Sequence, residues 1–490
     1  MQFPQTFGEL RRSKFSEARV RDRSVKDEMR ENLICKLKQK EPLFNGIVGY
    51  DDTVIPEIIN AILSRHNIIL LGLRGQAKSR IMRQMVSLLD EWVPLIAGCE
   101  INDNPYQPIC RRCSNALQDS GDDTPIQFLH RDNRFVEKLS TPDVTIADMI
   151  GDVDPIKAAK GGLQLSDELT IHYGLVPRGN RCIFAINELP DLAGKIQVGL
   201  FNILQEGDIQ IKGYPIRLKL DIMMVFSANP EDYTARGKII TPLKDRIGSE
   251  IHTHYPATLE EGIRITQQEA WTQRGDRTPA LPVFIREIVE EVAFQARKEK
   301  RVDKRSGVSQ RLPISTLENV ISSAERRAIV NGEKGVARIT DVYSAMPSIV
   351  GKLELEYEGE LKGAEQVTRD IIRCAIGQTF IKYFGPGDGL GNIIQWFENG
   401  GTLRVKQTAS TQDCLDHFAK VPDLIQKATS LGAVKSGENG LLVSACEFIL
   451  EGLCSQKRIS RSEETGVYAA NKKPQEPMFQ SYDKYKKHYN

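Results

Sequence analysis

The chain has 490 residues, 40% of them apolar and 27% charged, which is enough for two to four domains with real hydrophobic cores. Its 66 basic and 65 acidic side chains leave a net charge of +1, without the basic excess typical of a general nucleic-acid binder. The apolar runs are too short for a membrane span or a secretory signal, and the nine cysteines are irregularly spaced, which together predict a cytoplasmic protein with reduced thiols.

Five segments follow one another along the chain. Residues 1–40 are rich in charged helix formers and predict a helical N-terminal lead-in. Residues 41–256 alternate short β-rich runs with helical stretches, which predicts a parallel α/β sheet. The helix period dominates residues 257–362, expected to form an all-α lid, and residues 363–455, expected to form a further helical domain. Residues 456–490 have little apolar content and predict a flexible tail.

A β-hairpin is expected within the α/β segment, over Gly207–Asp221. Apolar residues occur at every other position on both sides of Gly213, as in two strands joined by a tight turn. The alternating residues are Ile209, Ile211, Ile216, Leu218 and Leu220.

A glycine-rich loop follows the apolar run HNIILLG and precedes a helical stretch. Its spacing is that of the phosphate-binding loop G-x-x-x-x-G-K-[ST], except that Ala77 replaces the last glycine. Backbone N–H groups of such a loop surround phosphates, while Lys78 would reach the β- and γ-phosphates and the Ser79 hydroxyl would ligate Mg²⁺. The residues expected to bind nucleotide here are Gly72, Leu73, Arg74, Gly75, Gln76, Ala77, Lys78, Ser79 and Arg80.

A second acidic motif follows the apolar run CIFAI, about a hundred residues further on. P-loop ATPases usually carry Asp-Glu at such a strand end, and this chain has Asn187 and Glu188. Glu188 is expected to polarise the attacking water. Asn187 would face the Mg²⁺ site but brings no charge, so we expect slower turnover or weaker Mg²⁺ binding, and a non-hydrolysing nucleotide switch remains an alternative.

Three further polar residues occur in the order expected of an ATPase site. Asn229 ends the apolar run IMMVFSA, where its amide would lie beside the γ-phosphate. Arg246, in PLKDRIGSEI, is placed to act as an arginine finger in a neighbouring subunit. Arg311, in SQRLPIS, would reach the phosphates from the start of a lid helix.

Taken in order, these motifs resemble the AAA+ ATPases of the magnesium chelatase I-subunit and MoxR-like group. The resemblance covers roughly residues 41–350 and rests on GIVGYDD, GLRGQAKS, STPDVTIADMIGDVDP, FAINELPDL, the hairpin, FSANPED, PLKDRIGSEI and SQRLPIS. It implies a P-loop AAA+ parallel sheet with a β-hairpin insert, an all-α lid, and ATP with Mg²⁺ bound between the subunits of a ring, commonly a hexamer.

The same resemblance implies several further roles. Ile47 and Val48 would lie beside the adenine. The hairpin and the insert over Thr141–Gly174 would project as remodelling elements. Partners with a von Willebrand factor A-type domain are common in the group, and the chain shows no DxSxS motif of such a domain itself.

A C-x-x-C pair lies in a polar insert outside these motifs. Cys110 and Cys113 have zinc-like spacing, and Cys99 or His130 could complete a site. No second pair follows at the spacing of a zinc ribbon, so unligated thiols in a loop remain the simpler interpretation.

The sequence therefore predicts an ATP-hydrolysing motor that remodels a partner protein. Its catalytic residues would be Lys78, Glu188, Asn229 and Arg246. A transcriptional regulator on the same fold would usually carry a helix-turn-helix and a GAFTGA loop, and neither occurs. A nucleic-acid helicase or loader is disfavoured by the balanced charge.

Overall fold

The computed structural model describes residues 3–165, 167–211, 217–230, 238–385, 389–431, 439–462 and 466–471. The chain divides into two compact units, residues 1–257 and 258–490. None of the helices in the described ranges has the length and apolar character needed to cross a bilayer.

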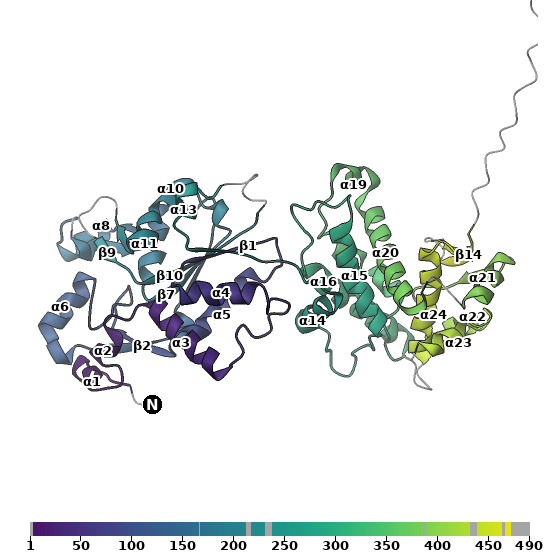
Figure 1. The fold of residues 1–490 in the computed structure, drawn as a ribbon, viewed down its shortest axis with the longest axis horizontal. Coiled ribbons are helices and arrows are strands. Elements are labelled where there is room, and N and C mark those ends of the chain that lie inside the picture. The colour runs from purple at the N-terminus through teal and green to yellow at the C-terminus, as the bar shows by residue number, and fades with distance from the viewer. Residues whose placement is uncertain are drawn as a thin grey trace, which may run out of the picture. The chain divides into compact units, whose positions relative to one another are not determined.

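A five-stranded parallel sheet forms the centre of the first unit (Figure 1), in the order β11-β1-β10-β7-β4. Because the strands are parallel, the loops that follow them emerge at one edge, where α/β folds bind their ligands. The strands of this sheet are β1 (Ile68–Leu71), β4 (Phe135–Leu139), β7 (Cys182–Asn187), β10 (Ile222–Ala228) and β11 (Ser249–His252).

The three central strands are buried along their whole length, because helices cover both faces of the sheet. Successive side chains alternate between two cores: Ile68 and Leu70 join one, and Ile69 and Leu71 the other. The main covering helices are α3 (Val25–Gln39), α4 (Val54–Leu63) and α5 (Lys78–Gln84) on one face, and α7 (Ile146–Met149), α9 (Leu175–Arg178), α10 (Gly194–Gly199) and α11 (Phe201–Gln205) on the other.

Small two-stranded antiparallel sheets also occur in this unit. The hairpin is present: β8 pairs with β9, placing Ile209 opposite Leu218, while its expected turn at Gly213 lies outside the described residues. The other elements of the unit are α1 (Phe7–Arg11), α2 (Glu17–Val20), β2 (Trp92–Ile96), α6 (Arg111–Ser120), β3 (Ile126–His130), β5 (Gly151–Val153), α8 (Pro155–Gly161), β6 (Ile171–Tyr173), β8 (Asp208–Gln210), β9 (Arg217–Lys219) and α13 (Thr241–Lys244).

The second unit is mostly helical around a single core. Phe284 of α15 stacks on Phe448 of α24 with ring centroids 4.6 Å apart. Its elements are α14 (Leu259–Glu269), α15 (Val283–Lys298), α16 (Arg311–Asn331), α17 (Ile339–Ser344), α18 (Met346–Val350), α19 (Tyr357–Lys362), α20 (Ala364–Phe384), α21 (Gly391–Glu398), β12 (Leu403–Arg404), α22 (Thr411–Phe418), α23 (Leu424–Ser430), α24 (Asn439–Ser455), β13 (Ile459–Arg461) and β14 (Val467–Ala470).

The predicted architecture is confirmed as a parallel α/β sheet with a β-hairpin insert, followed by mostly helical structure. Two details differ from the sequence-based expectation. The segments 257–362 and 363–455, expected as separate domains, share one core, because their apolar faces pack on each other. Residues 456–462 and 466–471, expected as tail, are folded: β13 and β14 form a three-stranded sheet with β12, and Tyr468 is fully buried.

Candidate functional site at the edge of the sheet

The loop between β1 and α5 has a conformation that its small residues make accessible. Gly75 has φ +76°, and Ala77 has φ 57° and ψ 12°, which is the left-handed region. Ala77 therefore occupies a backbone conformation that an alanine adopts at a cost of about 1–2 kcal/mol. A Cβ on Gly72 would lie 2.0 Å from Thr253 Oγ1, so only glycine fits at the start of the loop.

Two residues from distant parts of the chain hold this loop in place. The Tyr50 hydroxyl lies 3.1 Å from the carbonyl oxygen of Gln76, and burial raises the pKa of Tyr50 to about 12, so the phenol keeps its proton. Thr253, which follows β11, donates to Gln76 Oε1 at 2.7 Å. Neither residue belongs to the expected nucleotide-binding set, because contacts between segments so far apart leave no local pattern in a sequence.

Lys78, Asn229 and Glu188 form one hydrogen-bonded chain. The Lys78 ammonium, which is buried, donates to the carbonyl oxygens of Gly72 and Leu73 and, at 2.7 Å, to Asn229 Oδ1. The Asn229 amide in turn donates to Glu188 Oε2 at 2.9 Å. The parallel sheet thus brings together three of the expected catalytic residues, which follow three different strands.

Asn187 contacts both Ser79 and a carboxylate that the sequence does not single out. Its Oδ1 accepts from Ser227 Oγ at 3.1 Å and lies 3.5 Å from Ser79 Oγ. Its Nδ2 donates to Glu137 Oε1 at 2.5 Å, and Arg83 donates to the same carboxylate at 2.9 and 3.1 Å. Glu137 lies on the neighbouring strand β4, so a carboxylate from the next strand reaches the amide of Asn187.

Glu188 itself sits in a strained backbone conformation. Its φ of 54° and ψ of 53° place it in the left-handed region, which a residue with a side chain rarely adopts. The Ser227 hydroxyl accepts a hydrogen bond from the Glu188 N–H at 3.3 Å. This turn directs the carboxylate toward Asn229 at the sheet edge, and such strain is typical of functional sites.

The remaining expected residues lie around or away from this group. Ile47 packs against the core of the first unit, Val48 is half-buried beside it, and Arg80 lies in the first turn of α5. Arg246 is held by Gln205 Oε1 at 3.0 Å, by the carbonyl oxygen of Pro242 at 2.6 Å and by the ring of Phe201. Arg311 begins α16 in the second unit and is exposed.

The donor set fits a nucleotide with its magnesium ion. A buried ammonium, a hydroxyl at the start of a helix and a nearby amide oxygen are the groups that hold phosphates and a hard cation. Glu188 adds a carboxylate within reach of the Asn229 amide. These side chains can bind a triphosphate and accept a proton from water beside it.

Comparisons with known proteins give limited overlap. No protein-family model matches the chain. An archaeal Lon protease from Thermococcus kodakarensis is 30% identical over 213 residues, which is 40% of this chain and 32% of the relative. The Lon protease of Pyrococcus abyssi is 28% identical over 199 residues, which is 38% of this chain and 19% of that relative. The chain therefore spans about a third or less of these relatives.

Solved structures that match part of the chain include the BchI–BchD complex of magnesium chelatase, at 20% identity and TM-score 0.35, covering 65% of this chain and 98% of that one. NtrX from Brucella abortus in complex with ATP aligns at 13% identity and TM-score 0.38, covering 81% of this chain and 72% of that one. At these scores the likeness carries no functional argument, and the fold assignment rests on the strand order and the loop after β1.

Proposed function

We propose that this protein is an ATP-hydrolysing AAA+ motor subunit. The observation that carries the proposal is the chain from Lys78 through Asn229 to Glu188 at the edge of the parallel sheet. It places a phosphate-binding cation and a proton-accepting carboxylate on opposite sides of one amide. The left-handed backbone of Glu188 costs conformational energy, and residues with such strain cluster at functional sites.

Each residue then has a defined task. Lys78 and the loop N–H groups bind the β- and γ-phosphates. Asn229 and Glu188 orient a water, Glu188 takes its proton as the oxygen attacks the γ-phosphorus, and ADP leaves with the electrons of the broken P–O bond. Ser79 and Asn187 would hold Mg²⁺, which would supply positive charge next to the phosphate oxygens.

The decisive experiment separates binding from hydrolysis. Glu188→Gln should lower the ATPase rate by about 100-fold or more while nucleotide binding, measured by fluorescence anisotropy of a labelled ATP, is retained. Lys78→Ala should lose both. Glu206→Gln, an exposed carboxylate at the end of α11, is the matched control and should change neither. Unchanged hydrolysis in Glu188→Gln would end the proposal.

We further propose that sites are completed between subunits of a ring, with Arg246 as the finger in the neighbouring site. Its contacts to Gln205, Pro242 and Phe201 fix the guanidinium on the surface of its own unit, ready to meet another copy. Arg246→Ala should lower turnover by about a thousandfold. Exposed Arg264, changed to Ala, is the control and should turn over at the wild-type rate.

Mixing the two inactive variants tests the shared site directly. A ring of Glu188→Gln and Arg246→Ala subunits contains interfaces with both an intact carboxylate and an intact finger, so activity should return on mixing. A mixture no more active than its separate components would refute completion in trans. The mass of the ATP-bound complex gives the number of subunits in the ring, which is commonly six in the group that the sequence resembles.

The proposed work of the motor is remodelling of a partner protein, as in the magnesium chelatase and MoxR-like group. The hairpin and the insert over residues 141–174 supply the elements that would contact the partner, which we propose to carry a von Willebrand factor A-type domain. Arg311 is proposed to sense the phosphates from the second unit. ATPase stimulation by such a partner, and not by DNA, would separate this role from that of a helicase or loader.

A slow nucleotide switch is the second candidate, and Asn187 is the observation that favours it. With an amide beside Ser79, the cation site has one charge less than an Asp-Glu motif provides. Single-turnover and steady-state ATPase rates of the wild type distinguish the motor from the switch, because a switch hydrolyses bound ATP far more slowly than a motor does.

A further inference from the structure

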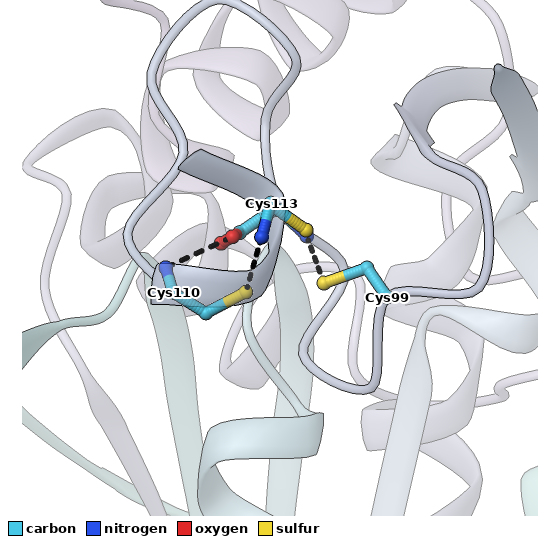
Figure 2. A group of neighbouring side chains, drawn as sticks. Cys99, Cys110 and Cys113 are labelled. Carbon is cyan, nitrogen blue, oxygen red and sulfur yellow. Dashed lines mark hydrogen bonds between the residues drawn. The ribbon is translucent and has the colours of Figure 1, made fainter. Parts of the chain in front are cut away.

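Three cysteines and an aspartate converge in the insert that follows β2. Cys99 and Asp103 lie in the loop before α6, Cys110 caps that helix, and Cys113 is in its first turn. One ligand atom from each of the four lies within 4.8 Å of all the others. Figure 2 shows the three sulfur atoms gathered around one point.

Backbone N–H groups already orient the ligand atoms. Ile101 and Asp103 donate to Cys99 Sγ at 3.4 and 3.3 Å, and Cys113 donates to Cys110 Sγ at 3.4 Å. Hydrogen bonds of this kind fix metal ligands and stabilise thiolate charge.

Asp103 supplies the independent indication of a missing ligand. Its side chain is fully buried, and Oδ2 accepts from the Cys110 N–H at 3.0 Å. The second oxygen, Oδ1, is buried without any hydrogen-bond partner. Leaving a buried polar atom unpaired costs about 1–3 kcal/mol, a cost that coordination to a cation would remove.

We propose that Cys99, Asp103, Cys110 and Cys113 bind one zinc ion. Three thiolates and one carboxylate give four ligands of types that zinc binds, and four protein ligands are typical of a closed structural zinc site. Zn–S bonds of about 2.3 Å in a tetrahedron put ligand atoms about 3.8 Å apart, so only a small contraction of the present group is required. The hard cations Mg²⁺ and Ca²⁺ would not select thiolates.

The position of the site indicates what the metal would do. Asn102 beside it donates to the carbonyl oxygen of Arg178 at 2.8 Å, and Asn180 donates to the carbonyl oxygen of Ile101 at 3.0 Å. Both partners immediately precede β7, the strand that ends in Asn187. The zinc ion would therefore tie the insert to the support of the catalytic strand, and it is independent of the proposed ATPase chemistry.

Metal analysis of the full chain, purified without chelator from zinc-supplied cells, is the first test. We expect about one zinc ion per chain in the wild type and loss of the metal in Cys113→Ser. Cys182→Ala removes an equally buried thiol outside the group and should keep the zinc. Equal zinc loss in both variants, or metal-free wild type, would overturn the proposal.

Cobalt substitution of the wild-type chain is the second test, and its main readout does not depend on a variant that folds. Co²⁺ added to the chelator-treated chain should give thiolate-to-cobalt charge-transfer absorption and tetrahedral d–d bands. Asp103→Cys should retain the metal with a shifted spectrum, as a fourth sulfur replaces oxygen. Absence of charge-transfer absorption, or a disulfide between these cysteines in the freshly purified protein, would refute the site.

Discussion

At the scale of single residues, Asn187 shows how one substitution depends on its neighbour. Its amide nitrogen donates to Glu137 while its oxygen accepts from Ser227. An aspartate could not donate, and two carboxylates at hydrogen-bond distance cannot both ionise freely. The amide is therefore matched to the glutamate on β4 and is not simply a weakened form of the usual acid.

Restoring the aspartate alone is accordingly expected to harm the enzyme. Asn187→Asp should lower ATPase activity by about tenfold, because the new charge repels Glu137 and disturbs Ser79. Glu137→Gln combined with Asn187→Asp restores a donor next to the acid and should recover the loss. Steady-state ATPase rates over a range of Mg²⁺ concentrations measure the loss in the single variant and the recovery in the double variant. A double variant that is as slow as the single one would contradict this coupling.

Ala77 provides a second test at the same scale. Since its backbone is left-handed, Ala77→Gly should raise the free energy of unfolding by about 0.5–1 kcal/mol. The control Ala116→Gly, in the right-handed helix α6, should lower it by about 1 kcal/mol. Urea unfolding gives both values, and a loss of stability in Ala77→Gly would show that the loop does not need this conformation.

At the scale of elements, the N-terminal helix α3 is a structural part of the sheet domain. Val25, Met29 and Leu33 enter its core. Glu28 accepts from both terminal nitrogens of Arg134, at 2.6 and 2.8 Å, with both side chains almost fully buried. The charged sequence of this segment gave no sign that one of its carboxylates is buried.

Breaking this pair should be costly. Glu28→Gln leaves the Arg134 charge buried without its counterion, and we expect the free energy of unfolding to fall by about 3–5 kcal/mol. Glu17→Gln in the exposed pair with Arg21 should change it by less than about 1 kcal/mol. Chemical denaturation of the two variants compares them, and equal small effects would mean that the buried pair is dispensable.

Elements also show which features sequence patterns can reveal. The buried strands and the loop with Lys78 follow from apolar runs and spacing, so both were predictable. Glu137 was not, because strand β4 has no motif and its neighbour in the sheet is about fifty residues away in the chain. Asp103 was missed in the same way. Cys99 or His130 was expected to complete the site, and the structure places Cys99 in the group, while His130 packs on Trp92 and accepts from the Asp132 N–H.

At the scale of the whole molecule, each unit has its own interior, and the described residues of the second unit share one hydrophobic core. Apolar residues from both expected helical segments belong to that interior, including Phe284 and Phe448. Composition alone cannot reveal a shared core. A break in the helix pattern marks the end of a helix, but the helices on either side of the break can still pack against each other.

The single core can be tested with two tryptophans that report on the two segments. Phe448→Ala should lower the stability of the second unit by about 3–5 kcal/mol. In single-tryptophan variants, the fluorescence transitions of Trp271 and Trp396 should shift together to lower denaturant. If the Trp396 transition moved and that of Trp271 did not, the segments would be separate domains.

The hydrogen bond between Lys78 and Asn229 has one further consequence. A phosphate that enters the loop competes with the Asn229 oxygen for the same ammonium, and Asn229 also holds Glu188. Under the proposed function, binding of a phosphate to Lys78 would therefore be coupled through the single amide of Asn229 to the position of the Glu188 carboxylate. Ligand recognition and the placement of the proton acceptor would then depend on the same three side chains.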